Sequence, residues 1–176
     1  MRRTVIPLLI ACLVAGLAST AAAAPTRGAS ARLVGLELSL VEQINALRVA
    51  RGLSRLTLST ALARAADSHS TSMLAAGFFA HESANGTSFG DRLTRFYALR
   101  SGWTVAENLA MFGGAEPRAE EVVRMWLDSP PHRANLLSPS FKELGLGVRH
   151  TPQGTGVYAG LATWVVTLDL GARGRR

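Results

Sequence analysis

Apolar residues recur at helical spacing in three separate parts of the chain. The first stripe predicts a helix over residues 36–50. The second predicts a helix over 60–76, which Gly77 ends. The third begins at Pro117, a residue that the first turn of a helix tolerates, and carries Trp126 on its apolar face. The chain therefore opens with helical rather than strand periodicity.

The C-terminal third changes to a strand pattern. Residues 144–150 predict one strand, 151–156 a polar turn rich in Gly and Pro, and 157–170 a second strand region. Residues 164–168 are almost continuously apolar or β-branched, which is typical of a strand covered on both faces. Helices that precede such a sheet and cover both of its faces predict an α+β fold. We expect a three-layer α/β/α sandwich with a central antiparallel sheet.

The intervening segments carry weaker patterns. We expect an extended connection over 53–58, a short helix over 91–99 and irregular or briefly extended chain over 102–109. Residues 136–137 predict a short helical or turn segment.

Several polar residues are placed by the helical pattern. Asn45 and Arg48 fall off the first apolar stripe and are expected on a solvated edge. His69 shares the apolar face of the second helix, which favours a buried, hydrogen-bonded core histidine over a ligand. Glu120 and Arg124 are spaced for an exposed ion pair on the third helix.

The N-terminus has the pattern of an export signal. A charged start, an apolar run and a small-residue exit predict a signal peptide over 1–24, too short an apolar run for a lasting membrane span. The chain's single cysteine, Cys12, lies inside this run in a lipobox-like context. The run continues past it, which favours ordinary cleavage over lipid attachment. A linker over 25–35, a domain over 36–171 and a basic tail over 172–176 follow.

Composition narrows the classes of function. The 176 residues carry a formal charge of +7, almost all of it from arginine, and 48% are hydrophobic. Export and the lack of basic runs with interleaved aromatics exclude nucleic acid as the partner, and the charge suits an anionic envelope surface. The sequence holds no His-Glu-x-x-His, no Gly-x-Ser-x-Gly elbow, no phosphate-binding Gly loop and no thiol after cleavage.

An ordered set of short motifs resembles a known family. The segments NALR, HSTSM, GFFAH, DR, ENLA, W…HRANLL and FKELGLG lie in that order at 45–48, 69–73, 77–81, 91–92, 107–110, 126–137 and 141–147. Together they resemble the CAP (SCP/PR-1-like) superfamily in its short bacterial secreted branch, over about residues 36–170. The resemblance implies the same α/β/α sandwich.

The resemblance also implies a cleft with two histidines and two acidic residues. By motif, the histidines are His81 and His132 and the first carboxylate is Glu107. The second carboxylate is expected where Ser129 stands, with Asp128 one position away, so the four-residue set is incomplete. By residue pattern alone, a His in a loop and a His beside Pro131 are also compatible with purely structural roles.

Two functions follow from this cleft. The first is a secreted, non-catalytic binding module for a lipid, glycan or protein ligand of the envelope. The second is a metal-dependent hydrolase such as a peptidase, in which His81 and His132 bind zinc or another divalent cation and Glu107 acts as general base. A Ser/His hydrolase lacks the motif context that would support it.

Overall fold

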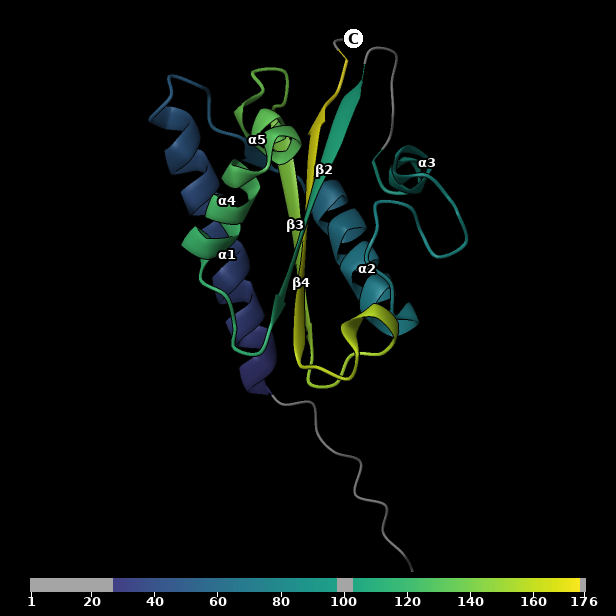
Figure 1. The fold of residues 1–176 in the computed structure, drawn as a ribbon. Coiled ribbons are helices and arrows are strands. Elements are labelled where there is room, and N and C mark those ends of the chain that lie inside the picture. The colour runs from purple at the N-terminus through teal and green to yellow at the C-terminus, as the bar shows by residue number, and fades with distance from the viewer. Residues whose placement is uncertain (1–26, 98–102, 175–176) are drawn as a thin grey trace, which may run out of the picture.

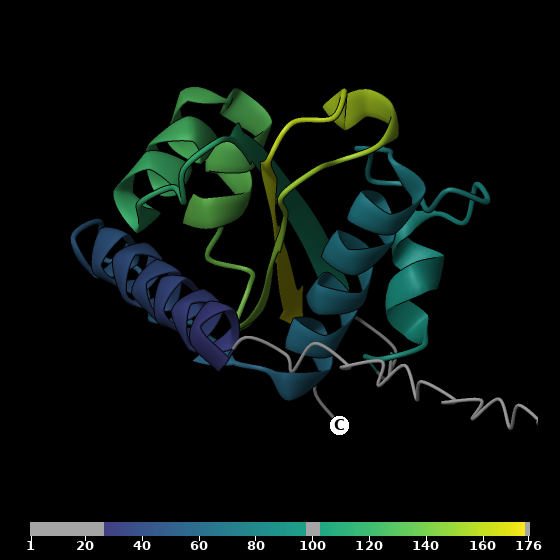
Figure 2. The same ribbon diagram turned by 90° about the horizontal axis from the view of Figure 1, so that it is seen from below.

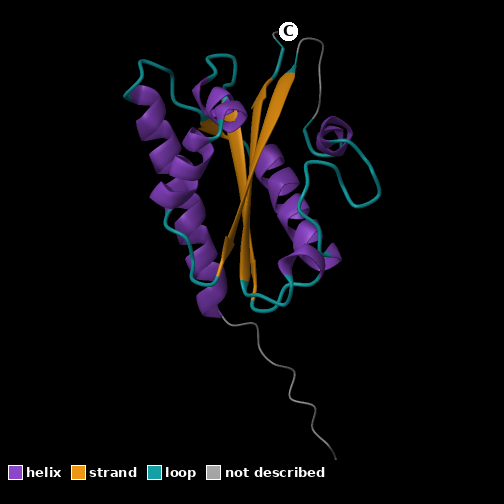
Figure 3. Cartoon of the chain, in the orientation of Figure 1, coloured by secondary structure: helices purple, strands orange, loops and turns teal. Residues whose placement is uncertain are grey.

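A computed structural model describes residues 27–97 and 103–174 of the chain. The predicted signal peptide lies outside these residues. The described chain forms a central sheet with helices on both of its faces (Figures 1 and 3). One face is covered by α1 (Arg27–Val49), α4 (Ala119–Asp128) and α5 (Pro130–Leu137), and the other by α2 (Thr60–Ala76) and α3 (Phe89–Thr94). The view from below separates the two helical layers clearly (Figure 2). The predicted three-layer sandwich is confirmed.

The sheet has the strand order β1-β3-β4-β2. The three long strands, β2 (Thr104–Gly113), β3 (Glu143–Thr151) and β4 (Thr163–Ala172), pair antiparallel, with β4 in the centre and β2 at an edge. The two-residue strand β1 (Thr57–Leu58) adds to β3 in the parallel direction. The short 3-10 helix η1 (Gly156–Tyr158) lies between β3 and β4, so the second strand begins later than the pattern indicated.

Alternation along β4 divides the core into two sides. Val166, Leu168 and Leu170 are fully buried and pack in the main apolar cluster with Trp126 of α4. The intervening residues face α2, where Thr167 hydrogen-bonds Ser70 at 2.8 Å. The strand is therefore covered on both faces, as its nearly continuous apolar pattern predicted.

Two glycines of β3 let α2 lie directly against the sheet. A Cβ on Gly145 would stand 2.0 Å from the backbone nitrogen of Ala63, and one on Gly147 would stand 2.3 Å from that of Asp67. Any side chain at either position would push the helix away. This close approach sets the distance between α2 and the sheet, and therefore the position of His69 on α2.

Several element boundaries differ from the sequence predictions. Helix α1 already begins at Arg27, so most of the expected linker over 25–35 is helical, and α3 ends at Thr94 rather than near 99. The expected tail begins inside β4, and Arg173 lies 3.3 Å from the carboxylate of Glu143. Helix α4 begins after Pro117 rather than with it.

The largest secondary-structure error concerns β2. Residues 102–109 were expected to be irregular or briefly extended, but β2 is a ten-residue strand that pairs with β4 along its whole length. Its polar residues Glu107 and Asn108 conceal the strand pattern because they are buried against other polar groups instead of facing water.

Asn45 and Arg48 are buried, with 2% and 1% of their surfaces exposed, so the predicted solvated edge is wrong. The Asn45 amide exchanges two hydrogen bonds with the backbone of Leu56. The Arg48 guanidinium donates to the carbonyls of Ser54, Leu136 and Ser138. Both residues therefore hold the first helix to distant chain segments. Glu120 likewise accepts a hydrogen bond from Gln43 of α1, and no ion pair with Arg124 forms.

Within residues 27–97 and 103–174, no helix has both the length and the apolar character needed to cross a membrane.

Candidate functional site

Glu107 is the centre of a buried polar cluster at the edge of the sheet. It lies on β2 and its side chain is 1% exposed. Its Oε1 accepts a hydrogen bond from Nδ1 of His81 at 2.8 Å, and its Oε2 forms an ion pair with the guanidinium of Arg92. Both carboxylate oxygens are thus engaged. The structure brings two of the four residues predicted for the cleft, His81 and Glu107, into direct contact.

Arg92 is the residue that attaches α3 to this cluster. It is 5% exposed, and besides binding Glu107 it donates from Nη1 to the backbone carbonyl of His81 at 2.7 Å. One guanidinium therefore neutralises the buried carboxylate and fixes the loop that carries the histidine. In the sequence Arg92 stands out only as part of the DR motif at 91–92, which does not indicate this role.

His81 is the exposed member of the cluster, with 48% of its side chain accessible. The hydrogen bond that His81 donates to Glu107 raises the pKa of His81, while partial burial opposes the shift. Its Nε2 makes no hydrogen bond within the described part of the chain. The imidazolium form is therefore stabilised, with one N–H available to a ligand.

His132 approaches the same edge from the other helical layer. It is half-buried on α5, and its backbone carbonyl accepts a hydrogen bond from Asn108 of β2 at 3.0 Å. Asn135 completes this attachment by donating to Asn108 at 2.8 Å. Burial lowers the pKa of His132, and the charge of His81 lowers it further. The two rings are close enough to interact electrostatically, and they form no direct hydrogen bond.

Ser129 stands at the junction of α4 and α5, in the position where the second carboxylate was expected. Its backbone carbonyl accepts from Arg133 at 2.8 Å, but its hydroxyl makes no capping hydrogen bond. The neighbouring Asp128 is exposed and lines a different hollow. Neither residue brings a second carboxylate to His81 and Glu107.

A zinc site normally takes three protein ligands when it leaves one position open. Among residues 27–97 and 103–174, no three His, Cys, Asp or Glu side chains lie together in a metal-binding arrangement. Glu107 is engaged with Arg92 and with Nδ1 of His81, which leaves at most the two imidazoles as ligands. The described side chains do not fit a three-ligand metal site.

Asp169 is a further acidic residue that sequence reasoning missed. It lies directly opposite Glu107 in the β2–β4 register and has no exposed surface. Neither of its carboxyl oxygens has a hydrogen-bond partner among the described residues. Burial raises the pKa of Asp169 well above its usual value, and the charge of Glu107 raises it further. The one available signal was a lone acidic residue inside an otherwise apolar strand.

Replacing Asp169 by asparagine is expected to stabilise the fold by about 1 kcal/mol at neutral pH. Because its folded-state pKa is raised, folded Asp169 binds its proton more tightly than unfolded Asp169, so stability is lost as pH rises above about 4. The gain in Asp169→Asn should therefore disappear below that pH. Urea denaturation of the wild type and of Asp169→Asn, at pH 3.5 and at pH 7.5, measures the difference in their free energies of unfolding. Equal destabilisation by Asp169→Asn at both pH values would contradict a raised pKa of Asp169 in the folded state. Asp128→Asn is the control, because Asp128 is exposed.

His69 behaves as the sequence predicted. It is 1% exposed on α2, and its Nε2 is 2.9 Å from the carbonyl of Ala80. Burial lowers the pKa of His69, so the ring is neutral and its Nε2–H donates. Its Nδ1 has no hydrogen-bond partner among the described residues.

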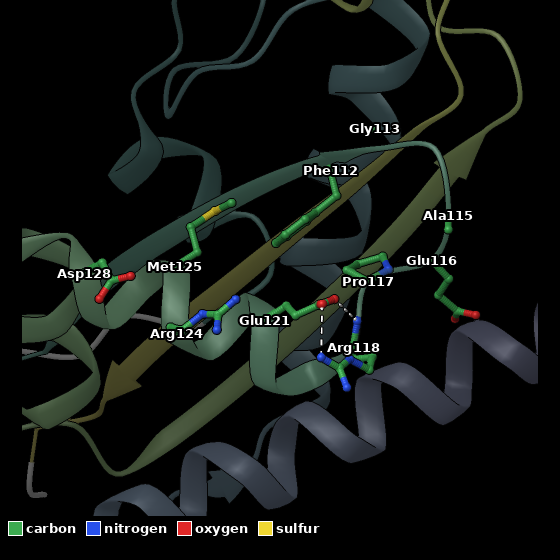
Figure 4. Close-up of a pocket in the computed structure, with 10 residues that line it drawn as sticks. All are labelled: Phe112, Gly113, Ala115, Glu116, Pro117, Arg118, Glu121, Arg124, Met125 and Asp128. Atoms are coloured by element: carbon green, nitrogen blue, oxygen red, sulfur yellow. Dashed lines mark hydrogen bonds and ion pairs between the residues drawn. The ribbon is translucent and has the colours of Figure 1, made fainter.

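A separate hollow of about 740 Å³ lies between the end of β2 and α4. Figure 4 shows Phe112 and Met125 on its apolar side and the ion pair between Arg118 and Glu121 on its rim. That pair belongs to the capping of α4, because Glu121 also accepts from the backbone of Arg118. None of the predicted cleft residues lines this hollow.

Comparison with known proteins identifies the relatives of this chain. The sequence is 32% identical over 122 residues to the uncharacterized protein YkwD of Bacillus subtilis, covering 69% of this chain and 46% of that protein. The crystal structure of an extracellular Bacillus anthracis protein with an SCP domain is 27% identical with a TM-score of 0.57, covering 76% of this chain and 40% of the other.

A cysteine-rich secretory protein from Staphylococcus aureus has the same fold, with 20% identity, a TM-score of 0.58, and coverage of 83% and 40%. This chain thus spans less than half the length of each of these three relatives. The family model described as CAP, the cysteine-rich secretory protein family, matches residues 41–168. With the motif order, the sandwich and this match in agreement, the chain belongs to the CAP family.

Proposed function

We propose that this chain is an exported, non-catalytic binding module that captures a ligand of the cell envelope in the cleft of His81, Glu107 and His132. The observation that carries the proposal is the state of Glu107. Both of its oxygens are engaged and its side chain is buried, so it orients His81 instead of facing a substrate.

The alternative is a metal-dependent hydrolase, in which Glu107 would have to act as the general base. A general base must lie within hydrogen-bond reach of the water that it deprotonates. Glu107 would first have to leave the Arg92 guanidinium, which would strand a buried positive charge. The geometry therefore favours binding over hydrolysis.

The two histidines indicate the chemistry of the ligand. His81 is stabilised as a cation and His132 as a neutral ring, and both are accessible in part. Together they donate hydrogen bonds to a group rich in acceptors. Hydroxyl- and carbonyl-rich glycans and anionic lipid headgroups have this character, and a protein surface rich in carbonyls or carboxylates offers it as well.

Export is the second part of the proposal. It rests on the charged start, apolar run and small-residue exit of residues 1–24. The similar Bacillus anthracis protein is described as extracellular, which supports the same location for this chain.

The cleft is tested by NMR titration with three probes, which are an N-acetylglucosamine oligomer, short-chain phosphatidylglycerol and Zn²⁺. We expect the glycan or the lipid to shift the signals of His81 and His132 and to bind about tenfold more weakly to His81→Ala. For the anionic lipid, affinity should fall as pH rises through the raised pKa of His81, and this step should be absent in His81→Ala. His150→Ala is the control, because His150 packs on Trp164 at another part of the surface.

Two outcomes would contradict the proposal. One is binding of both organic probes with the same affinity in the wild type, His81→Ala and His132→Ala. The other is tight Zn²⁺ binding that requires both histidines, together with hydrolytic activity lost in Glu107→Gln. That result would favour the hydrolase.

A further inference from the structure

A second recess lies beside the cleft, between α2 and the loop that leads into α3. Its volume is about 280 Å³, which is close to the lower limit for pockets that hold small organic ligands. None of the three cleft residues lines it. Most of its lining residues are polar or basic and none is acidic: Ser68, His69, Ser72, Ser83, Ala84, Asn85, Arg92, Arg95 and Phe96.

Two buried residues of this lining have unused hydrogen-bonding atoms. The Nδ1 of His69 and the Nε of Arg92 have no partner among the described residues, although both side chains are more than nine-tenths buried. Buried polar atoms without a partner are rare in folded proteins, and each one needs an explanation. The Nδ1 of the neutral His69 ring accepts and the Nε–H of Arg92 donates, so a ligand in the adjoining recess that carries both an acceptor and a donor, as a partly protonated oxyanion does, would supply one.

The hydroxyls of Ser68, Ser72 and Ser83 point to the same kind of ligand. None of the three forms a hydrogen bond in the described ranges 27–97 and 103–174, and Ser72 and Ser83 are half-buried. Hydroxyls can all donate to one acceptor-rich group, since each rotates to suit its partner. Three such donors on two chain segments surround one small volume.

The charge at the recess is positive. Arg92 is neutralised by Glu107, but Arg95 has no ion pair within the described residues. Arg64 adds a second cation nearby, with its guanidinium 6.0 Å from the ring centre of Phe96. The carboxylate of Asp91 accepts a hydrogen bond from Ser88 at the start of α3, so it is already engaged.

We propose that this recess is a binding site for a phosphate group, with Arg95 and the three serine hydroxyls as its main donors. Arginine supplies a planar, permanently charged fork that suits phosphate oxygens. The ring of Phe96 offers an apolar wall to the organic part of a phosphate ester. The recess is too small for an acyl chain, so it accepts free phosphate or an exposed phosphate headgroup.

Calorimetric titration with inorganic phosphate, at ionic strength held constant with NaCl, tests this site directly. We expect saturable binding to the wild type, at least tenfold weaker binding to Arg95→Gln, and weaker binding to Ser72→Ala. Arg124→Gln is the matched control, because Arg124 is an exposed arginine on the opposite helical layer and forms no ion pair with any residue that the structure describes. It should bind phosphate as the wild type does.

Co-sedimentation with phosphatidylglycerol vesicles, against phosphatidylcholine vesicles, identifies the source of the phosphate. Arg95-dependent binding to phosphatidylglycerol vesicles without affinity for free phosphate assigns the site to a headgroup. Loss of phosphate binding in His132→Ala but not in Arg95→Gln would move the anion to the histidine cleft and overturn the proposal. Absence of binding in both experiments would overturn it as well. Because the two sites use different variants, failure here leaves the proposed function of the cleft intact.

Discussion

Replacing Arg92 by methionine is expected to destabilise the fold by about 3–5 kcal/mol at neutral pH. Within residues 27–97 and 103–174, Arg92 is the only cation in contact with the buried Glu107 carboxylate apart from the half-exposed His81. Without it, Glu107 and Asp169 remain side by side in the sheet, and the half-exposed His81 alone among the described residues offsets their burial. The same substitution removes the hydrogen bond to the carbonyl of His81 and so releases the loop. Urea denaturation measures the loss.

The pH dependence distinguishes this mechanism from a simple loss of packing. In Arg92→Met the buried carboxyls are tolerated only when they are protonated, so the deficit relative to the wild type should shrink as pH falls toward 4. A deficit that stays constant between pH 4 and 8 would contradict the electrostatic explanation. Arg95→Met is the matched control, because Arg95 is exposed and lies one turn further along. It should change stability by less than about 0.5 kcal/mol.

The spacing of apolar residues along the chain predicted most of the fold. Helix α2 was predicted with its N-terminal boundary and with Gly77 as its end, and Gly77 does adopt the left-handed conformation with φ of 68°. The strands β3 and β4 were predicted because apolar and β-branched residues dominate them. In both cases burial against a neighbouring layer leaves a regular trace in the sequence.

Where polar residues are buried, the same reasoning failed. Arg48 and Asn45 were assigned to solvent because polar residues beside an apolar stripe usually are exposed. Their hydrogen-bond partners, such as Leu56 and Leu136, are backbone groups on other segments of the chain. Nothing local in a sequence reveals a backbone carbonyl that arrives from a distant segment.

The candidate site, too, could be predicted only in part from the sequence. The motifs identified His81 and Glu107, and these two residues do contact each other. Asp169 and Arg92 were missed because their roles depend on strand register and on the docking of α3. The opposition of Asp169 and Glu107 follows from a β2–β4 pairing that was itself not predicted. A site built across a sheet edge becomes visible only once the register is known.

Arg48→Met is the second substitution for which we expect a large effect, a loss of about 3–4 kcal/mol. The guanidinium of Arg48 satisfies three carbonyls, at 2.9 Å for Ser54, 2.7 Å for Leu136 and 3.0 Å for Ser138. Methionine fills a similar volume but leaves these acceptors without a donor in a site that is 1% exposed. The melting temperature should fall by roughly 10 °C, at about 2–4 °C per kcal/mol for a domain of this size.

Arg48→Met should also change the surroundings of His132 in the candidate cleft. Arg48 holds the C-terminal end of α5, and the first turn of this helix carries His132. Two of its three acceptors belong to the end of α5, where carbonyls lack helical partners and carry partial negative charge. We therefore expect the NMR signals of His132 to shift in Arg48→Met while those of His69, on α2, stay in place. Arg51→Met is the control, since Arg51 is exposed just after the end of α1 and its guanidinium donates at 3.5 Å to the carbonyl of Leu47 on that helix. A stable Arg48→Met variant with unshifted His132 would show that water replaces the guanidinium and that α5 is held by its apolar contacts alone.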